Sequence, residues 1–161
     1  MSWEYALGEA CLTVIVGVVV YALGIAVVNF YIKPVNKLSK VIGEILDSLV
    51  FYANIYTNSA RPDISPEDKK SRDEASFTIR HNATLLLSRA QQVRLYSVAS
   101  ALRVVPSKLA INEAHSNLIG LSNYCFKSNP IGTFELSERV KKLLTTHEIP
   151  PQVPLQNLVT A

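Results

Sequence analysis

The side chains that could bind a metal ion or carry redox chemistry lie far apart in this chain of 161 residues. The two cysteines, Cys11 and Cys125, are widely separated, and neither has a histidine at the spacing that zinc sites use. The three histidines, His81, His115 and His147, are equally dispersed. We therefore expect free thiols facing a reducing compartment, no metal site and no cofactor.

Residue pairs that could exchange a proton also fail on geometry. Arg80 and His81 are adjacent and would point about 100° apart on a helix. Glu113 and His115 are two residues apart and would diverge. No glycine-rich loop follows a strand pattern to hold a phosphate, and a formal net charge of +3 does not favour nucleic acid as a partner. We predict no catalytic residue and a protein that is not an enzyme.

The most informative element is the apolar segment from Ala10 to Ile32, which contains no Asp, Glu, Lys or Arg. At roughly 1.5 Å per residue, its length matches the ~30 Å hydrocarbon core of a bilayer. Aromatic residues bracket it, as at the two water interfaces of a spanning helix: Trp3, Tyr5, Phe30 and Tyr31. The alternative, a buried helix of a soluble protein, would need a larger core than the remaining residues supply. We predict a single transmembrane helix over residues 10–32.

Charge at the two ends of this segment predicts its orientation. Residues 1–9 carry Glu4 and Glu9 and no basic side chain, so they do not resemble the start of a secretory signal peptide. Basic residues follow the segment at once: Lys33, Lys37 and Lys40. The positive-inside rule then places residues 1–9 outside the cell and the remainder in the cytoplasm, with the lysines at lipid headgroups of the inner (plasma) membrane.

Small residues form two patterns within the predicted span. Ala10, Gly17 and Gly24 recur every seven residues along one stripe, while Ala22 and Ala26 form a small-xxx-small pair on another face. Such positions let two helices approach closely in lipid, which predicts a homo-oligomer assembled through the anchor. The alternative is that glycine and alanine are simply frequent in spanning helices.

Residues 33–147 have the pattern of a cytoplasmic bundle of four or five helices, so the predicted fold class is all-α. Apolar residues at helical spacing and capping or turn residues divide the region. The predicted elements are a helix over 35–56 that could continue the span, a helix from Pro66 capped by Ser65, a bend or short helix within 95–105, a helix after Ser107, a loop over 127–133 and a helix over 134–146. Residues 148–161 are predicted to be a proline-rich flexible tail.

In residues 41–56 (VIGEILDSLVFYANIY) and 117–123 (NLIGLSN) the chain resembles uncharacterised bacterial proteins with one N-terminal span and a helical cytoplasmic domain. That resemblance covers most of the length and implies no established activity. In architecture alone the chain also resembles the membrane accessory protein of Cas13b-type CRISPR systems. This second resemblance implies a HEPN-like helical domain and assembly into a ring-shaped membrane pore.

The HEPN ribonuclease signature places an Arg, a polar residue and four to six further residues before a His, bringing a cation and an acid-base group together at a dimer seam. Arg139 and His147 give the nearest match in this chain. Val140 stands where the signature has a polar residue. The resemblance therefore implies at most a degenerate HEPN-like ribonuclease.

These patterns favour a membrane-anchored interaction or regulatory module that forms a homo-oligomer and binds an unidentified cytoplasmic protein partner. The first alternative is a homo-oligomeric pore or effector of a bacterial defence system. Apart from Tyr31 at the water interface, polar side chains in the span are limited to Cys11, Thr13, Tyr21 and Asn29, so such a pore would have to gate by dewetting of an apolar constriction. The second alternative is the HEPN-like ribonuclease.

Overall fold

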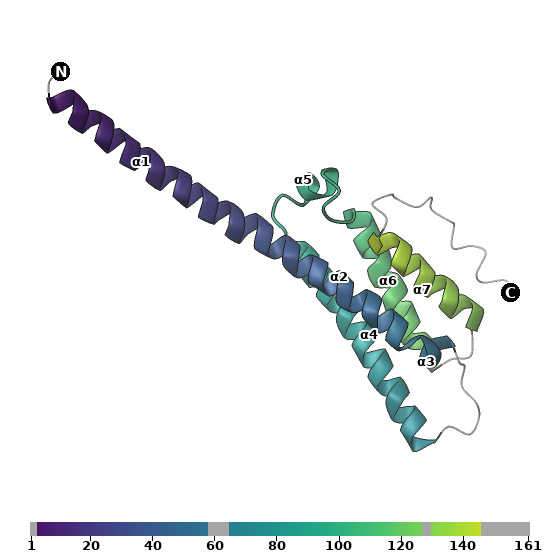
Figure 1. Cartoon of the computed structure of the whole chain (residues 1–161). Coiled ribbons are helices and arrows are strands. Elements are labelled where there is room, and N and C mark those ends of the chain that lie inside the picture. Colours follow the sequence, from purple (N-terminus) through teal and green to yellow (C-terminus); the bar gives the residue numbers. More distant parts are fainter. Residues whose placement is uncertain (1–2, 58–64, 127–129, 146–161) are drawn as a thin grey trace.

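A computed structural model describes residues 3–57, 65–126 and 130–145, and the regular elements in these ranges are all helices (Figure 1). In chain order they are α1 (Trp3–Val27), the π-helical turn η1 (Val28–Ile32), α2 (Lys33–Phe51), α3 (Ala53–Thr57), α4 (Pro66–Gln92), α5 (Tyr96–Ala101), α6 (Lys108–Tyr124) and α7 (Pro130–Thr145). The all-α class predicted from the sequence is confirmed.

The first three elements form one continuous helical rod, whose N-terminal part extends well away from the other helices (Figure 1). Every described side chain from Gly8 to Ile25 is exposed. The most apolar stretch of the rod has a mean hydropathy of 2.7. The chain thus has one N-terminal helix that is long and apolar enough to cross a membrane.

The remaining helices pack into a bundle around the C-terminal part of the rod. Helix α4 packs against both α2 and α6, α7 packs on α6, and the short α3 contacts α4, α6 and α7. The largest fully buried side chains come from all five of these helices: Tyr56, Leu38, Ile45, Leu49, Ile79, Leu86, Ile111, Leu118, Leu121 and Leu143. Apolar side chains within 35–56, 75–93 and 111–125 all contribute to this core.

The predicted cap at Ser65 is confirmed, and Ser107 caps the helix that follows it. The Ser65 hydroxyl accepts a hydrogen bond from the backbone N–H of Asp68 at 3.1 Å, and the Ser107 hydroxyl accepts one from the N–H of Ala110 at 3.1 Å. Each serine has an extended backbone and satisfies an amide that lacks a partner in the first helical turn. Pro66 follows as the first helical residue of α4, where its missing N–H costs nothing.

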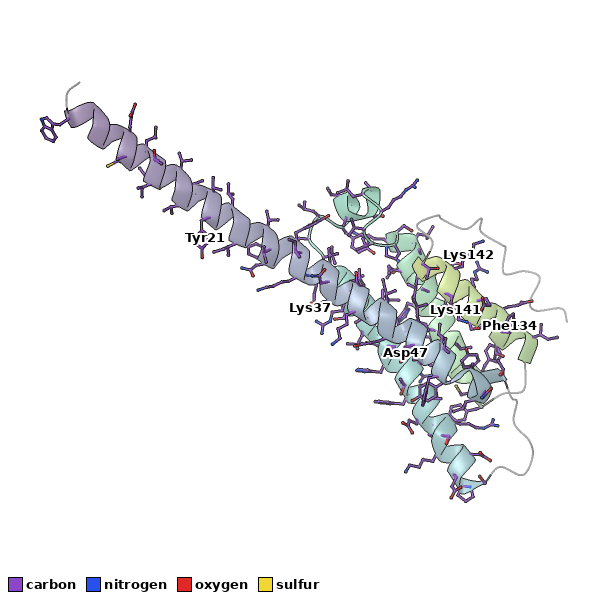
Figure 2. The ribbon with its side chains drawn as sticks, in the orientation of Figure 1. Tyr21, Lys37, Asp47, Phe134, Lys141 and Lys142 are labelled. Carbon is purple, nitrogen blue, oxygen red and sulfur yellow. The ribbon has the colours of Figure 1, made fainter. Side chains whose placement is uncertain are left out.

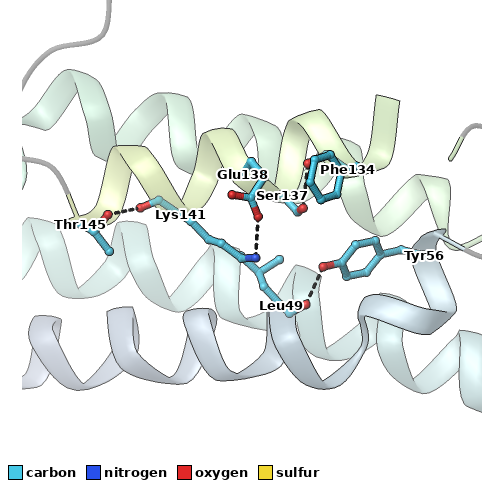
Figure 3. A network of polar contacts seen from close by, with 7 residues as sticks. All are labelled: Leu49, Tyr56, Phe134, Ser137, Glu138, Lys141 and Thr145. Atoms are coloured by element: carbon cyan, nitrogen blue, oxygen red, sulfur yellow. Dashed lines mark hydrogen bonds and ion pairs between the residues drawn. The ribbon is translucent and has the colours of Figure 1, made fainter. Parts of the chain in front are cut away.

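Two predicted boundaries are wrong. The helix expected over 35–56 breaks at Tyr52, and α3 restarts the chain so that the Tyr56 ring is buried and its hydroxyl donates to the carbonyl of Leu49 (Figure 3). The last helix begins at Pro130 rather than Phe134, because proline is well suited to the first helical position. The tail over 148–161 lies outside the described residues.

Polar side chains of α4 tie it to the C-terminal end of α6. The Ser76 hydroxyl donates to the carbonyl of Ser122 at 3.0 Å, Arg72 donates to the carbonyl of Cys125 at 3.3 Å, and Arg80 donates to the Asn123 side chain at 2.7 Å. The last carbonyls of a helix have no partner within it and carry partial negative charge, so two guanidinium groups stabilise this end. The register of α4 on α6 is therefore set by hydrogen bonds as well as by packing.

Burial changes the proton affinity of three groups in the core. It raises the pKa of the Cys125 thiol from 9.0 to about 11, that of Tyr96 from 10.0 to about 12, and that of Tyr56 above its ordinary value. The Tyr96 hydroxyl also donates to the carbonyl of Pro106 at 2.8 Å. Because the folded state binds these protons more tightly than the unfolded state, they add stability below about pH 9 that is lost as the pH rises towards 12.

We therefore expect the melting temperature of the full-length protein in detergent to fall as the pH rises from 9 to 12. Tyr96→Phe should lower stability at pH 7 by about 0.5–1.5 kcal/mol, because the hydrogen bond to Pro106 is lost. The same variant should lose less stability than the wild type above pH 10, because one titrating group is gone. Thermal melts followed by circular dichroism measure both effects, and parallel pH profiles for the two proteins would contradict the assignment to Tyr96.

Candidate functional site

The candidate functional surface begins on the exposed flanks of α1, where the predicted small residues lie. Since α1 is a regular helix through Val27, Ala10, Gly17 and Gly24 follow one stripe. A methyl group built at either glycine would meet no atom within 4 Å. Ala22 is also exposed, and Ala26 is half-buried. The stripe is therefore bare in a single copy of the chain.

Gly24 also forms the floor of an open groove of about 320 Å³ on the rod. The groove is lined by Tyr21, Gly24, Ile25, Val28 and Asn29. Tyr21 projects from α1 well outside the bundle (Figure 2). The missing side chain at Gly24 creates a depression that an apolar side chain of a neighbouring helix could fill.

The junction between the apolar helix and the bundle contains the π turn. Asn29 on this turn accepts a hydrogen bond from the Lys33 ammonium at 2.7 Å, so the predicted headgroup lysine reaches back along the rod. The guanidinium carbon of Arg94 lies 4.8 Å from the ring centroid of Phe30. This cation–π contact joins the loop before α5 to the last turn of the apolar segment.

The other two predicted lysines lie one and two turns further along the rod. Lys37 is exposed on α2, close to the junction (Figure 2). Lys40 forms an ion pair with Glu44 at 3.8 Å, but both side chains are largely exposed and such pairs contribute little to stability. The three lysines thus lie along one face of the start of α2.

The described structure places one residue of the HEPN-like hypothesis, Arg139. Arg139 on α7 is held by Glu113 on α6: its Nε donates to the carboxylate at 2.7 Å, and a second nitrogen of the guanidinium contacts the same oxygen. His147 lies outside the described residues. A ribonuclease role for Arg139 would first require its guanidinium to leave Glu113.

The remaining histidines lie apart from one another. His81 stacks on Phe77, with ring centroids 6.0 Å apart, and His115 is half-buried on α6. Within residues 3–57, 65–126 and 130–145, no group of three metal-binding side chains is close enough to hold an ion. Cys125 is buried, whereas Cys11 is exposed on α1.

Sequence reasoning missed a cavity of about 290 Å³ between α4, α5 and α6. Its lining is mostly apolar and includes Lys108, whose Nζ lies 5.6 Å from the centre of the Tyr96 ring: Leu87, Ala90, Gln91, Val93, Tyr96, Lys108, Ile111 and Asn112. The residues come from three separate helices, so no local pattern could have grouped them. Comparison with protein-family models, with curated proteins and with solved structures found no match for this chain.

We expect the Arg139–Glu113 pair to stabilise the bundle. Both side chains are about two-thirds or more buried, so the energetic coupling should be about 1 kcal/mol, at the upper end for partly exposed pairs. A double-mutant cycle with Arg139→Met and Glu113→Gln, measured by chemical denaturation, would give this value. If the two single effects simply add, the pair does not stabilise the fold.

Proposed function

We propose that the chain is a single-span, membrane-anchored helical protein whose cytoplasmic bundle acts as a non-enzymatic interaction or regulatory module, assembled as a homo-oligomer. The observation that carries the proposal is the exposed apolar surface of α1. A Val, Leu or Ile side chain gains about 1.5–3 kcal/mol when it leaves water. Leaving all the apolar side chains of α1 in water would cost more free energy than the ~5–15 kcal/mol that stabilises a typical domain.

The charge around the rod supports the proposed orientation. Lys33, Lys37 and Lys40 follow the apolar segment directly. The charged side chains within residues 1–9, by contrast, are both acidic: Glu4 and Glu9. Positively charged residues are retained on the cytoplasmic side during insertion. The bundle is therefore assigned to the inner face of the plasma membrane, with the N-terminus outside.

The bare stripe of α1 supports assembly through the anchor. In lipid, helices associate by close van der Waals packing rather than by the hydrophobic effect, so glycine positions with open space beside them favour contact. The groove at Gly24 offers a place for a side chain of the second copy. These features support a homo-oligomer.

The bundle supports an interaction role through apolar side chains that remain on its surface. Phe51, Phe77 and Ile131 are each more than 70% exposed. Each of these side chains offers apolar surface whose burial by a bound partner would be favourable. A protein partner on the cytoplasmic side would cover one or more of them.

Membrane placement and orientation can be tested together. Full-length protein should stay with the membrane fraction after a carbonate wash and should require detergent for release, because the apolar helix is held in the bilayer. A reporter enzyme that works only in the cytoplasm should be active when it is fused after Ala161. Release into the soluble fraction, or activity of an exported reporter at that position, would overturn the proposal.

Assembly through the stripe predicts a size change on substitution. Gly17→Leu combined with Gly24→Leu should reduce the oligomer to a monomer in mild detergent, since the added side chains keep the helices apart. Val16→Leu is the control, because it lies about 100° around the helix from Gly17 and away from both small-residue faces. Light scattering coupled to size-exclusion chromatography measures the mass. An unchanged mass would remove the stripe as the interface, and a wild-type ring of six or more copies would favour the pore alternative.

A further inference from the structure

The short helix α5 lies beside the C-terminal end of the apolar helix, apart from the main bundle (Figure 1). The contact between Arg94 and Phe30 places the start of this segment at the level of the π turn. If α1 crosses the membrane as proposed, Phe30 lies at the cytoplasmic water interface. The segment from Arg94 to Leu109 therefore lies at the depth of the lipid headgroups.

This segment has two apolar faces. One faces the core and fixes the segment to the bundle through Tyr96, Ala99 and Val105, all of which are buried. The other faces solvent, with Leu95 at 69% and Leu102 at 65% exposure, and continues through Val98, Val104 and Leu109. Helix α5 therefore has one apolar side that the bundle covers and one that no other part of the described structure covers.

The backbone at both ends of α5 adopts a conformation that is unfavourable for its residues. Leu95 and Arg103 each have a φ of 56°, in the left-handed region that glycine normally occupies. These two bends flank α5 and accompany the outward position of both side chains. Strain of this kind persists where the surrounding structure imposes it, often at a binding surface.

The charged side chains around this segment are cationic. From residue 75 to 112 the sequence contains no Asp or Glu, while five exposed or half-exposed cations fall within it: Arg80, Arg89, Arg94, Arg103 and Lys108. Lys33 and Lys37 on the rod lie at the same end of the domain. The first turns of α4, at the opposite end of the bundle (Figure 1), carry both signs of charge: Glu67, Asp68, Asp73 and Glu74 with Lys69, Lys70 and Arg72.

We propose that the segment Arg94–Leu109 is a second membrane contact, in which Leu95, Val98, Leu102 and Val104 enter the lipid interface while Arg94, Arg103 and Lys108 bind anionic phosphates. The inference rests on the proposed span, which brings this face to the bilayer. A lipid surface fits both the exposed apolar side chains and the neighbouring cations, since acyl chains lie beneath negatively charged headgroups. The segment would hold the domain against the membrane rather than leave it free on its stalk.

The test places an environment-sensitive fluorophore at single cysteines in full-length protein carrying Cys11→Ser and Cys125→Ala, reconstituted into vesicles. The labelled positions are Leu102→Cys on the proposed contact, Phe77→Cys as an exposed control on α4, and Val18→Cys in the span. Vesicles of phosphatidylcholine alone are compared with a phosphatidylcholine–phosphatidylglycerol mixture. Quenching is measured with a lipid carrying a shallow nitroxide and with a water-soluble quencher.

We expect position 102 in the anionic vesicles to be quenched several-fold more by the lipid nitroxide than position 77, and to be shielded from the aqueous quencher. Arg94→Gln with Arg103→Gln, surface changes that leave the core intact, should remove most of the difference between the two lipid compositions. A lipid-buried position 18 with a water-exposed position 102 would overturn this inference and leave the anchor standing. A water-exposed position 18 would overturn the anchor itself. Equal quenching at 102 in both compositions would overturn the role of the cations.

Discussion

The apolar surface of α1 is the constraint on which the rest of the molecule depends. Its side chains lie outside the bundle, and those from Gly8 to Ile25 are all exposed. No rearrangement within the small bundle could cover them, because its own core is already filled by side chains from α2, α3, α4, α6 and α7. Lipid or further copies of the helix would lower the free energy of this surface, and this is why we propose that α1 is a membrane anchor.

The continuous helix fixes the position of the bundle relative to α1. The backbone passes from α1 through η1 into α2 with helical angles at Val27 and Lys33, so the rod has no flexible linker at the junction. Arg94 on Phe30 adds a contact from a distant part of the chain. If α1 is the proposed anchor, a domain fixed in this way would present the same end to the bilayer at all times, and the cations of that end would lie beside the headgroups.

The spacing of apolar residues predicted the helices of the bundle, because each of them buries one apolar face. The capping residues Ser65 and Ser107 could also be read from the sequence, because a cap depends only on residues next to it in the chain. The prediction of one helix over 35–56 failed at Tyr52, where burial of Tyr56 against the bundle overrides the helical pattern. The partner of Arg139 was also hidden, because Glu113 comes from another helix. The small-residue stripe and the lysines could be read from the sequence, whereas the outward face of α5 required the positive φ angles at Leu95 and Arg103.

The π turn reconciles the proposed helix contact with the bulk of the bundle. In a regular α-helix the inward residues of α2, such as Leu38 and Ile45, would lie roughly 75° around the rod from the glycine stripe. A second copy packed on Gly17 and Gly24 would then meet the bundle of the first. The turn from Val28 to Ile32 adds one residue to its loop and so rotates the following helix by about a further 100°. The stripe and the bundle are thereby brought to nearly opposite sides of the rod, which leaves the glycine face open to a neighbour.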